Sequence, residues 1–232
     1  MAPSCILTGE PLAVADDRER EMTVRIVLAL VASLVACGDT ARAQRSVDGN
    51  RLVSTARPGV RLELDEELEY LGSQEIDLYD VAHAEQYFFA DLDGKRVQRL
   101  YWIQFEHVLD ESDHTYDYSD LPDVVTLGGH SFRTDRRVWN LDEMSIDPES
   151  DFGRALEFIR KRGYTVGPDF MRQRMVWVFD EAKRQELLLI YAEDLTYHDL
   201  TAAELSRDEE RWKAVAEDLN RRAREALRLS DS

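Results

Sequence analysis

The residue types best suited to chemistry lie on a hairpin expected over residues 83–109, in which Asp93-Gly94 is a two-residue turn dipeptide. With that turn, the alternation of side chains along the strands places His83, Glu85 and Glu106 on one face. One imidazole and two carboxylates can ligate a metal or act as acid and base. The same group can instead be a polar rim at the open end of the hairpin. A slip of one residue in the register would send its members to opposite faces.

A second hairpin is expected over residues 171–194. It would bring Arg172 and Arg174 close to Glu193 and Asp194, at the end away from its turn. Arginine makes forked, geometrically specific pairs with carboxylates. The sequence therefore predicts a cross-strand ion-pair cluster that fixes the register, and the alternative is a pair of arginines that binds an anion at the mouth of a pocket.

Acidic residues are concentrated in the segment 110–123, and oxygen-rich loops can bind Ca²⁺. Their spacing is not that of a calcium-binding loop, so we expect a solvated loop without a metal. The short motifs of serine hydrolases, zinc proteases, P-loop NTPases and dinucleotide-binding proteins do not occur in the sequence. We therefore expect no cofactor.

The two hairpins and their short connections predict an α+β fold, with an antiparallel sheet built from the two hairpins and helices on one side of it. One helix is expected at 152–162, capped by Ser150-Asp151. A C-terminal amphipathic helix is expected at 209–227, where a core-sized apolar stripe recurs at helical spacing. In the central part of both hairpins, the odd-numbered and the even-numbered residues are both apolar, which is typical of strands that are covered on both faces.

The clearest functional signal is an apolar run at 26–36, directly after Arg25. Eleven helical residues extend about 16 Å, roughly half of a bilayer core, so the run is too short to span a membrane. Its length and basic flank are typical of the apolar region of a secretory signal. Residues 1–21 are acidic, unlike the front of such a signal, and we expect translation to begin at Met22.

Two cleavage sites compete after the apolar run. The tetrapeptide Leu-Val-Ala-Cys, which ends at Cys37, resembles the lipobox of bacterial lipoproteins. The resemblance implies cleavage after Ala36 and acylation of the Cys37 thiol, which would anchor the protein to a membrane. Alternatively, the Ala-Arg-Ala sequence that ends at Ala43 is an ordinary signal-peptidase site, and Cys37 is then removed with the signal.

The sequence predicts four segments. Residues 1–21 are an upstream extension, residues 22–43 a signal region, residues 44–58 a flexible tether rich in turn residues, and residues 59–230 a single α+β domain. Both cysteines precede this domain, so no disulfide within the domain can stabilise it.

The formal net charge of −18 argues against a nucleic-acid partner, because attraction to phosphate needs an excess of Lys and Arg. We expect an exported protein, in the periplasm or anchored to the outer membrane of a bacterium, with membrane contact only through a lipid at Cys37. The leading hypothesis is non-catalytic binding of an envelope protein or of a small or lipid-like ligand. One alternative is an envelope hydrolase or metal-dependent enzyme that uses His83, Glu85 and Glu106. Another is a purely structural interaction domain.

Overall fold

The computed structural model describes residues 44–232 apart from Pro122. The predicted upstream extension, the signal region, the cleavage positions Ala36 and Ala43, and the lipidation position Cys37 lie outside the described residues. Within the described part of the chain, no helix has both the length and the apolar character needed to cross a bilayer.

Strands make up most of the regular structure. They are β1 (Arg45–Asp48), β2 (Arg51–Ser54), β3 (Val60–Leu64), β4 (Glu69–Leu78), β5 (Ala82–Asp93), β6 (Arg96–Val108), β7 (Asp123–Leu127), β8 (His130–Asn140), β9 (Thr165–Val166), β10 (Asp169–Val178), β11 (Gln185–Asp194) and β12 (Leu227–Asp231). The helices are α2 (Asp151–Lys161), the 3₁₀ helix η1 (Leu195–His198), α3 (Ala202–Arg207) and α4 (Glu209–Glu225).

The strands form two sheets. The large sheet has the order β4-β5-β6-β11-β10-β8-β7, with β9 added in parallel beside β6, and the small sheet has the order β1-β2-β3-β12. The predicted α+β class is therefore wrong: the protein is mostly β, with two antiparallel sheets. The two expected hairpins are present as β5–β6 and β10–β11, and β6 and β11 pair with each other at the centre of the large sheet.

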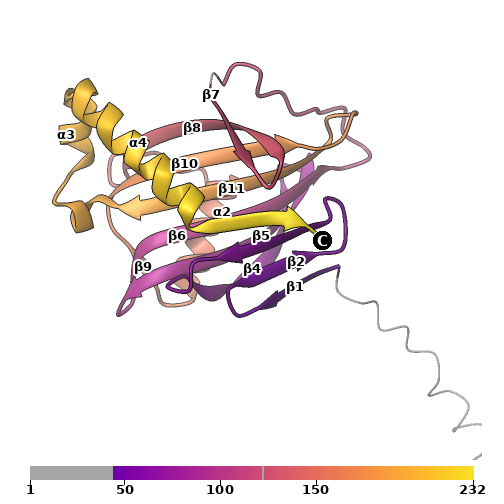
Figure 1. The fold of residues 1–232 in the computed structure, drawn as a ribbon, viewed down its shortest axis with the longest axis horizontal. Helices are drawn as coiled ribbons and strands as arrows, with labels where there is room; N and C mark the ends of the chain where they lie inside the picture. The colour runs from indigo at the N-terminus through magenta and orange to yellow at the C-terminus, as the bar shows by residue number, and fades with distance from the viewer. Residues whose placement is uncertain (1–43, 122) are drawn as a thin grey trace, which may run out of the picture. The chain divides into compact units, whose positions relative to one another are not determined.

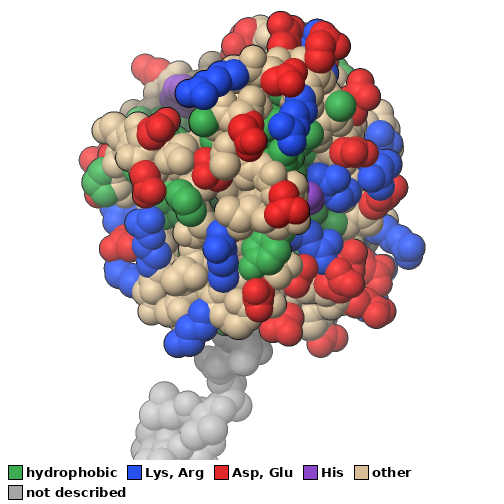
Figure 2. Space-filling view, turned by 90° about the vertical axis from the view of Figure 1, so that its left-hand side faces the viewer, with side chains coloured by type: hydrophobic (Ala, Val, Ile, Leu, Met, Phe, Trp, Pro, Cys, Tyr) green, Lys and Arg blue, Asp and Glu red, His purple; other side chains and the backbone are tan. Residues whose placement is uncertain are grey.

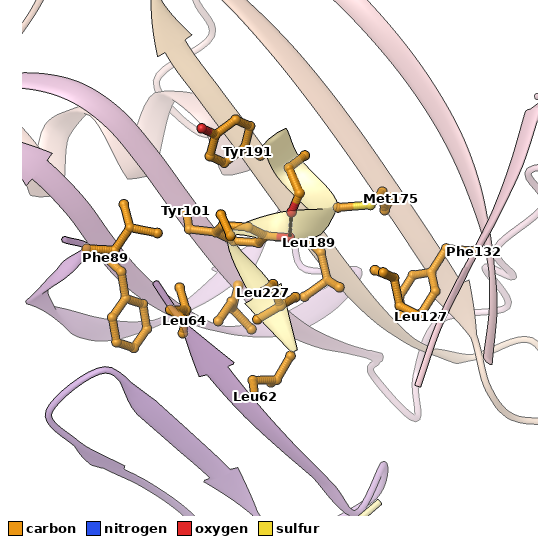
Figure 3. Close-up of a cluster of buried hydrophobic side chains, with 14 of the residues drawn as sticks. Leu62, Leu64, Phe89, Tyr101, Leu127, Phe132, Met175, Leu189, Tyr191 and Leu227 are labelled. Atoms are coloured by element: carbon orange, nitrogen blue, oxygen red, sulfur yellow. Dashed lines mark hydrogen bonds between the residues drawn. The ribbon is translucent and has the colours of Figure 1, made fainter. Parts of the chain in front are cut away.

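One face of the large sheet packs against the small sheet and α4 (Figure 1). The buried cluster between them joins Leu62 and Leu64 of the small sheet to Phe89, Tyr101 and other large-sheet residues (Figure 3). The Tyr101 hydroxyl also donates a hydrogen bond to a carbonyl oxygen near the end of α4, at 3.2 Å. The odd-numbered residues of β5, β6 and β11 point to this face.

Helix α2 covers part of the opposite face, where the even-numbered residues of the same strands lie. Phe88 and Trp102 pack there against Phe158 and Ile159 of the helix. Ser150 caps the helix as expected, because its hydroxyl accepts a hydrogen bond from the Gly153 N–H. The prediction of helices on one side only is wrong, since α2 and α4 lie on opposite faces of the large sheet. The apolar residues of both parities in β6 and β11 reflect this double coverage.

Two further expectations fail at the ends of the fold. The expected tether at 44–58 contains β1 and β2 of the small sheet, and Leu52 of β2 is fully buried in the core between the two sheets. The expected helix at 209–227 ends at Glu225, and Leu227 begins β12, which pairs with β3. A short strand of four or five residues has too few alternations to be recognised from its pattern alone.

Candidate functional site

The predicted cluster of His83, Glu85 and Glu106 does not form. In the structure, Gly94 occupies the first position of the hairpin loop, with φ +61°, and an extra residue in β6 shifts the register near Asp91. His83 therefore pairs with His107, and Glu106 pairs with Ala84. The observed register differs from the expected one by an odd number of residues, because His83 was expected opposite Gln104. His83 and Glu85 therefore face the small-sheet side, and Glu106 faces the α2 side.

His83 and Glu85 each have a local partner. The Nδ1 atom of His83 lies 2.8 Å from a carboxylate oxygen of Asp77 on β4. Glu85 forms an ion pair with Arg45 of β1 and accepts a hydrogen bond from the Tyr87 hydroxyl at 2.9 Å. These contacts tie β1 and β4 to β5, which is a structural role.

The second predicted cluster also has different partners. Arg172 and Arg174 both bind Asp135 of β8, at 2.9 and 2.8 Å. Glu193 points to the opposite face, where Arg222 of α4 donates two hydrogen bonds to it. Asp194 accepts a hydrogen bond from Arg96 at 2.8 Å. The arginines and the acidic residues thus fix the register of the sheet, but with other partners than expected.

A pair of glutamates at the centre of the large sheet has the geometry of a functional site. Glu106 of β6 and Glu186 of β11 are directly opposite each other in the antiparallel register, and both point to the α2 side. Directly opposite residues have Cβ atoms about 5 Å apart. Glu186 is 1% exposed, and its Oε2 atom has no hydrogen-bond partner among the residues that the structure describes.

A chain of three glutamine side chains leads across the sheet to Glu106. The amide of Gln74 donates to Gln86 at 2.6 Å, that of Gln86 donates to Gln104 at 2.7 Å, and that of Gln104 donates to Glu106 at 2.5 Å. All three amides are oriented in the same direction, with their N–H groups towards the carboxyl group. Aligned dipoles of this kind reinforce one another and stabilise negative charge on Glu106.

The other side of the pair is covered by the strap, which we define as residues 109–121. The hydroxyl of Tyr116 donates to Glu106 at 2.6 Å, and that of Tyr118 donates to Glu186 at 3.2 Å. The strap is held to the β10–β11 turn by a backbone hydrogen bond from Tyr116 to Lys183 at 2.8 Å. Two tyrosines at i and i+2 thus place one hydroxyl on each carboxyl group.

The strap, the sheet and the start of α2 line an open pocket of about 370 Å³, which we call the carboxyl-pair pocket. Its polar wall includes Glu106, Glu186, Asp151 and Arg174. The remaining wall is aromatic and aliphatic and includes Tyr79, His114, Tyr116, Tyr118, Leu78 and Leu188. A cavity of this volume, with an apolar lining and a few convergent polar groups, is typical of a small-molecule site.

Burial sets the protonation of this pocket. It raises the pKa of Glu186 well above the ordinary 4.5, and the nearby charge of Glu106 raises it further. Burial also raises the pKa of Glu106, but the hydrogen bonds from Tyr116 and Gln104 oppose that shift. The pKa of Asp151 is raised by burial as well. Of the pair, Glu106 is therefore the member that ionises more readily.

Arg174 forms an ion pair with Asp135 rather than with either glutamate, and its charge offsets only part of the rise in the pKa of Glu186. Its Nε atom donates to Asp135, and its guanidinium group lies 5.5 Å from the centre of the Tyr118 ring. Within residues 44–121 and 123–232, no three His, Cys, Asp or Glu side chains come close enough together to hold a metal ion.

Comparisons of the chain with protein-family models, with curated proteins and with solved structures found no match.

Sequence reasoning selected Glu106 but gave it the wrong neighbours, and it missed Glu186 and the tyrosines of the strap. A signal was present for Glu186, because it is an acidic residue at the start of a strand whose next residues are all apolar. Tyr116 and Tyr118 stood out only as aromatic residues in an acidic loop.

Proposed function

We propose that this chain binds a small polar solute in the carboxyl-pair pocket. The observation that carries the proposal is the Oε2 atom of Glu186, which is buried in the pocket wall and has no partner in the described part of the chain. An unsatisfied buried polar atom costs about 1–3 kcal/mol, and a hydrogen bond from a bound solute is one way to offset that cost. A bound solute that reaches Oε2, which is closed to solvent in the described structure, would supply the missing hydrogen bond.

The volumes of two cavities favour a small ligand over a lipid-like one. The apolar cavity beside α2, lined by Leu100, Leu156 and Phe170 among others, has a volume of only about 50 Å³. An acyl chain needs several times that space. The carboxyl-pair pocket is larger, and its wall combines hydrogen-bonding and aromatic groups.

The proposal is tested by thermal unfolding of the purified protein with a panel of small amines, alcohols, sugars and carboxylic acids. We expect at least one class to raise the Tm of the wild type, because a ligand that binds only the native state stabilises it. The variant Glu186→Gln should change that response. The matched control is Glu75→Gln on β4, whose side chain is 74% exposed, and it should respond as the wild type does.

Native mass spectrometry of protein purified from its own host provides a second readout. A mass increment that is present in the wild type and in the Glu75 variant, and reduced in the Glu186 variant, would support the pocket as its site. The proposal fails if no class of solute shifts the Tm and no increment is found.

The asymmetry of the pair supports a second candidate, acid–base hydrolysis. Glu186 would donate a proton and Glu106 would act as base, because their surroundings separate the pKa values of the two carboxyl groups. Turnover of chromogenic glycosides or esters by the wild type, lost in Glu186→Gln while the solute still binds, would favour this candidate. Binding without turnover would leave the binding protein as the function.

We also propose that the protein acts outside the cytosol, on the strength of the apolar run after Arg25 and the cleavage motifs at Cys37 and Ala43. Intact-mass analysis of the native protein distinguishes the two sites. A chain that begins at an acylated Cys37 supports the lipobox, one that begins at Gln44 supports the signal-peptidase site, and a full-length cytosolic chain contradicts export.

A further inference from the structure

Three acidic side chains converge on the carboxyl-pair pocket. Glu106 and Glu186 come from adjacent strands, and Asp151 comes from the first turn of α2. The basic residue in the same wall is Arg174, whose charge is shared with Asp135. The other titratable groups that face Glu186 from the strap are Tyr116, Tyr118 and His114. The wall therefore has an excess of acidic groups.

The two glutamates differ in how well they are satisfied. Glu106 accepts one hydrogen bond on each oxygen, from Tyr116 and from Gln104. Glu186 accepts one long hydrogen bond from Tyr118, and its second oxygen has no partner among the described residues. A buried carboxylate with a single long hydrogen bond is costly, so burial favours the protonated form of Glu186 while the pocket is empty.

The non-polar part of the wall limits the kind of cation that fits. The rings of Tyr116 and Tyr118 and the side chains of Leu78 and Leu188 would contact a ligand along with the carboxyl groups. Aromatic faces attract ammonium groups, and aliphatic side chains accommodate a hydrocarbon body. A bare metal ion would leave most of this wall without a partner.

We propose that the pocket takes a small organic ammonium compound, and that its binding releases the proton of Glu186. The Glu186 side chain turns towards the ligand, because its Oε2 atom is closed to solvent in the empty pocket. The ammonium N–H groups then donate to its oxygens, and the carboxyl proton passes to the solvent, so that the ammonium ion takes the place of the proton. This inference rests on the proposed function and names the class of solute.

Isothermal titration calorimetry with benzylammonium and n-butylammonium tests the exchange, in two buffers that differ in ionisation enthalpy. At about pH 5, which lies above the ordinary glutamate pKa and below the raised pKa of Glu186, we expect the measured heats to differ between the buffers by close to one released proton per bound cation. Affinity should rise by up to tenfold per pH unit from about pH 4.5 to the raised pKa of Glu186, and then level off, because only the free protein holds the proton. The amine itself stays charged over that range.

The uncharged analogues benzyl alcohol and n-butanol, the anion butyrate, and Mg²⁺ serve as comparison probes. In Glu186→Gln, binding of the amines should weaken at least tenfold and lose its dependence on buffer. If that variant does not fold, the buffer dependence of the wild type alone decides.

The outcomes separate the two proposals. If an alcohol or butyrate binds as tightly as the amines, or if an amine binds without proton release, the cation exchange is wrong and the pocket remains a solute site. Preferential binding of Mg²⁺ would also overturn the inference. If no probe of any class binds, the proposed function itself fails.

Discussion

Two buried glutamates on the same strand, β11, have opposite surroundings. Glu193 accepts hydrogen bonds from Tyr191, His198 and Arg222, and these donors lower its pKa to about 2. Glu186 has a single donor, and burial raises its pKa well above 4.5. The first residue joins α4 to the sheet, and the second is the one that we propose binds a ligand. The number of donors, rather than depth of burial, separates the pKa values of these two carboxyl groups.

Replacing Glu186 by Gln should stabilise the protein at neutral pH and not at low pH. Because the folded-state pKa of Glu186 is raised, ionisation destabilises the native state as the pH rises above 4.5. The stability difference should grow by up to ~1.4 kcal/mol per pH unit until the raised pKa is reached. Urea unfolding of both proteins from pH 4 to pH 8 measures it. A difference that does not vary with pH would contradict this account of Glu186.

Replacing Glu193 by Gln should have the reverse sign. The folded-state pKa of Glu193 is lowered, so its contribution is fully present above pH 4.5 and is lost as the pH falls through about 2. We expect a loss of about 3 kcal/mol at pH 7, which shrinks towards zero in strong acid. Chemical unfolding of this variant beside the wild type checks the value. An equal loss at pH 3 and pH 7 would show that the charge is not what matters.

At the scale of elements, much of the fold was predictable and its register was not. The sequence predicted β5–β6, β10–β11, α2 and most of α4, because long apolar or amphipathic segments carry strong periodic signals. It did not predict the β-bulge near Asp91, which adds one residue to β6 and moves Glu106 to the other face. A single extra residue leaves the hydrophobic pattern of a doubly covered strand almost unchanged. The candidate site depended on that residue and was therefore misassigned.

The turn between β7 and β8 offers a test of how the two sheets meet. Gly128 has φ +57°, and a Cβ atom there would overlap the backbone of Leu229 on β12. Gly49 has nearly the same φ, +58°, but has open space around it. Both substitutions to Ala incur a left-handed strain of about 1–2 kcal/mol, and Gly128→Ala adds about 1–3 kcal/mol of overpacking.

Unfolding of the two variants under identical conditions provides the comparison. The Tm of Gly128→Ala should be several degrees below that of Gly49→Ala. Equal values would mean that β12 does not pack against this turn.

At the scale of the whole molecule, the layers explain why the sequence alone misled. Helix α2 and the small sheet cover opposite faces of the large sheet, and the sequence indicates that both faces are covered but not which elements cover them. Acidic and basic side chains are interspersed on the surface in Figure 2, which agrees with the many ion pairs between neighbouring strands and helix turns.

The short strands β1 and β2 should be part of the folded unit rather than a tether. A chain that begins at Gln44 keeps β1 and the Arg45–Glu85 ion pair, whereas one that begins at Gly59 loses these and the buried Leu52. We expect the longer chain to match the full protein in Tm and the shorter one to lose at least about 3 kcal/mol, typical of removing one large core side chain. Equal stability of the two chains would mean that residues 44–58 are a flexible tether and contribute nothing to the folded unit.

The site-specific titration of Glu186 tests the central claim most directly. The carboxyl ¹³C chemical shift of this residue, assigned by comparison with Glu186→Gln, reports its protonation as the pH is varied with and without benzylammonium. We predict a midpoint well above 4.5 for the free protein and a midpoint lowered by the bound cation. A midpoint near the ordinary glutamate value of about 4.3, unchanged by the cation, would contradict it.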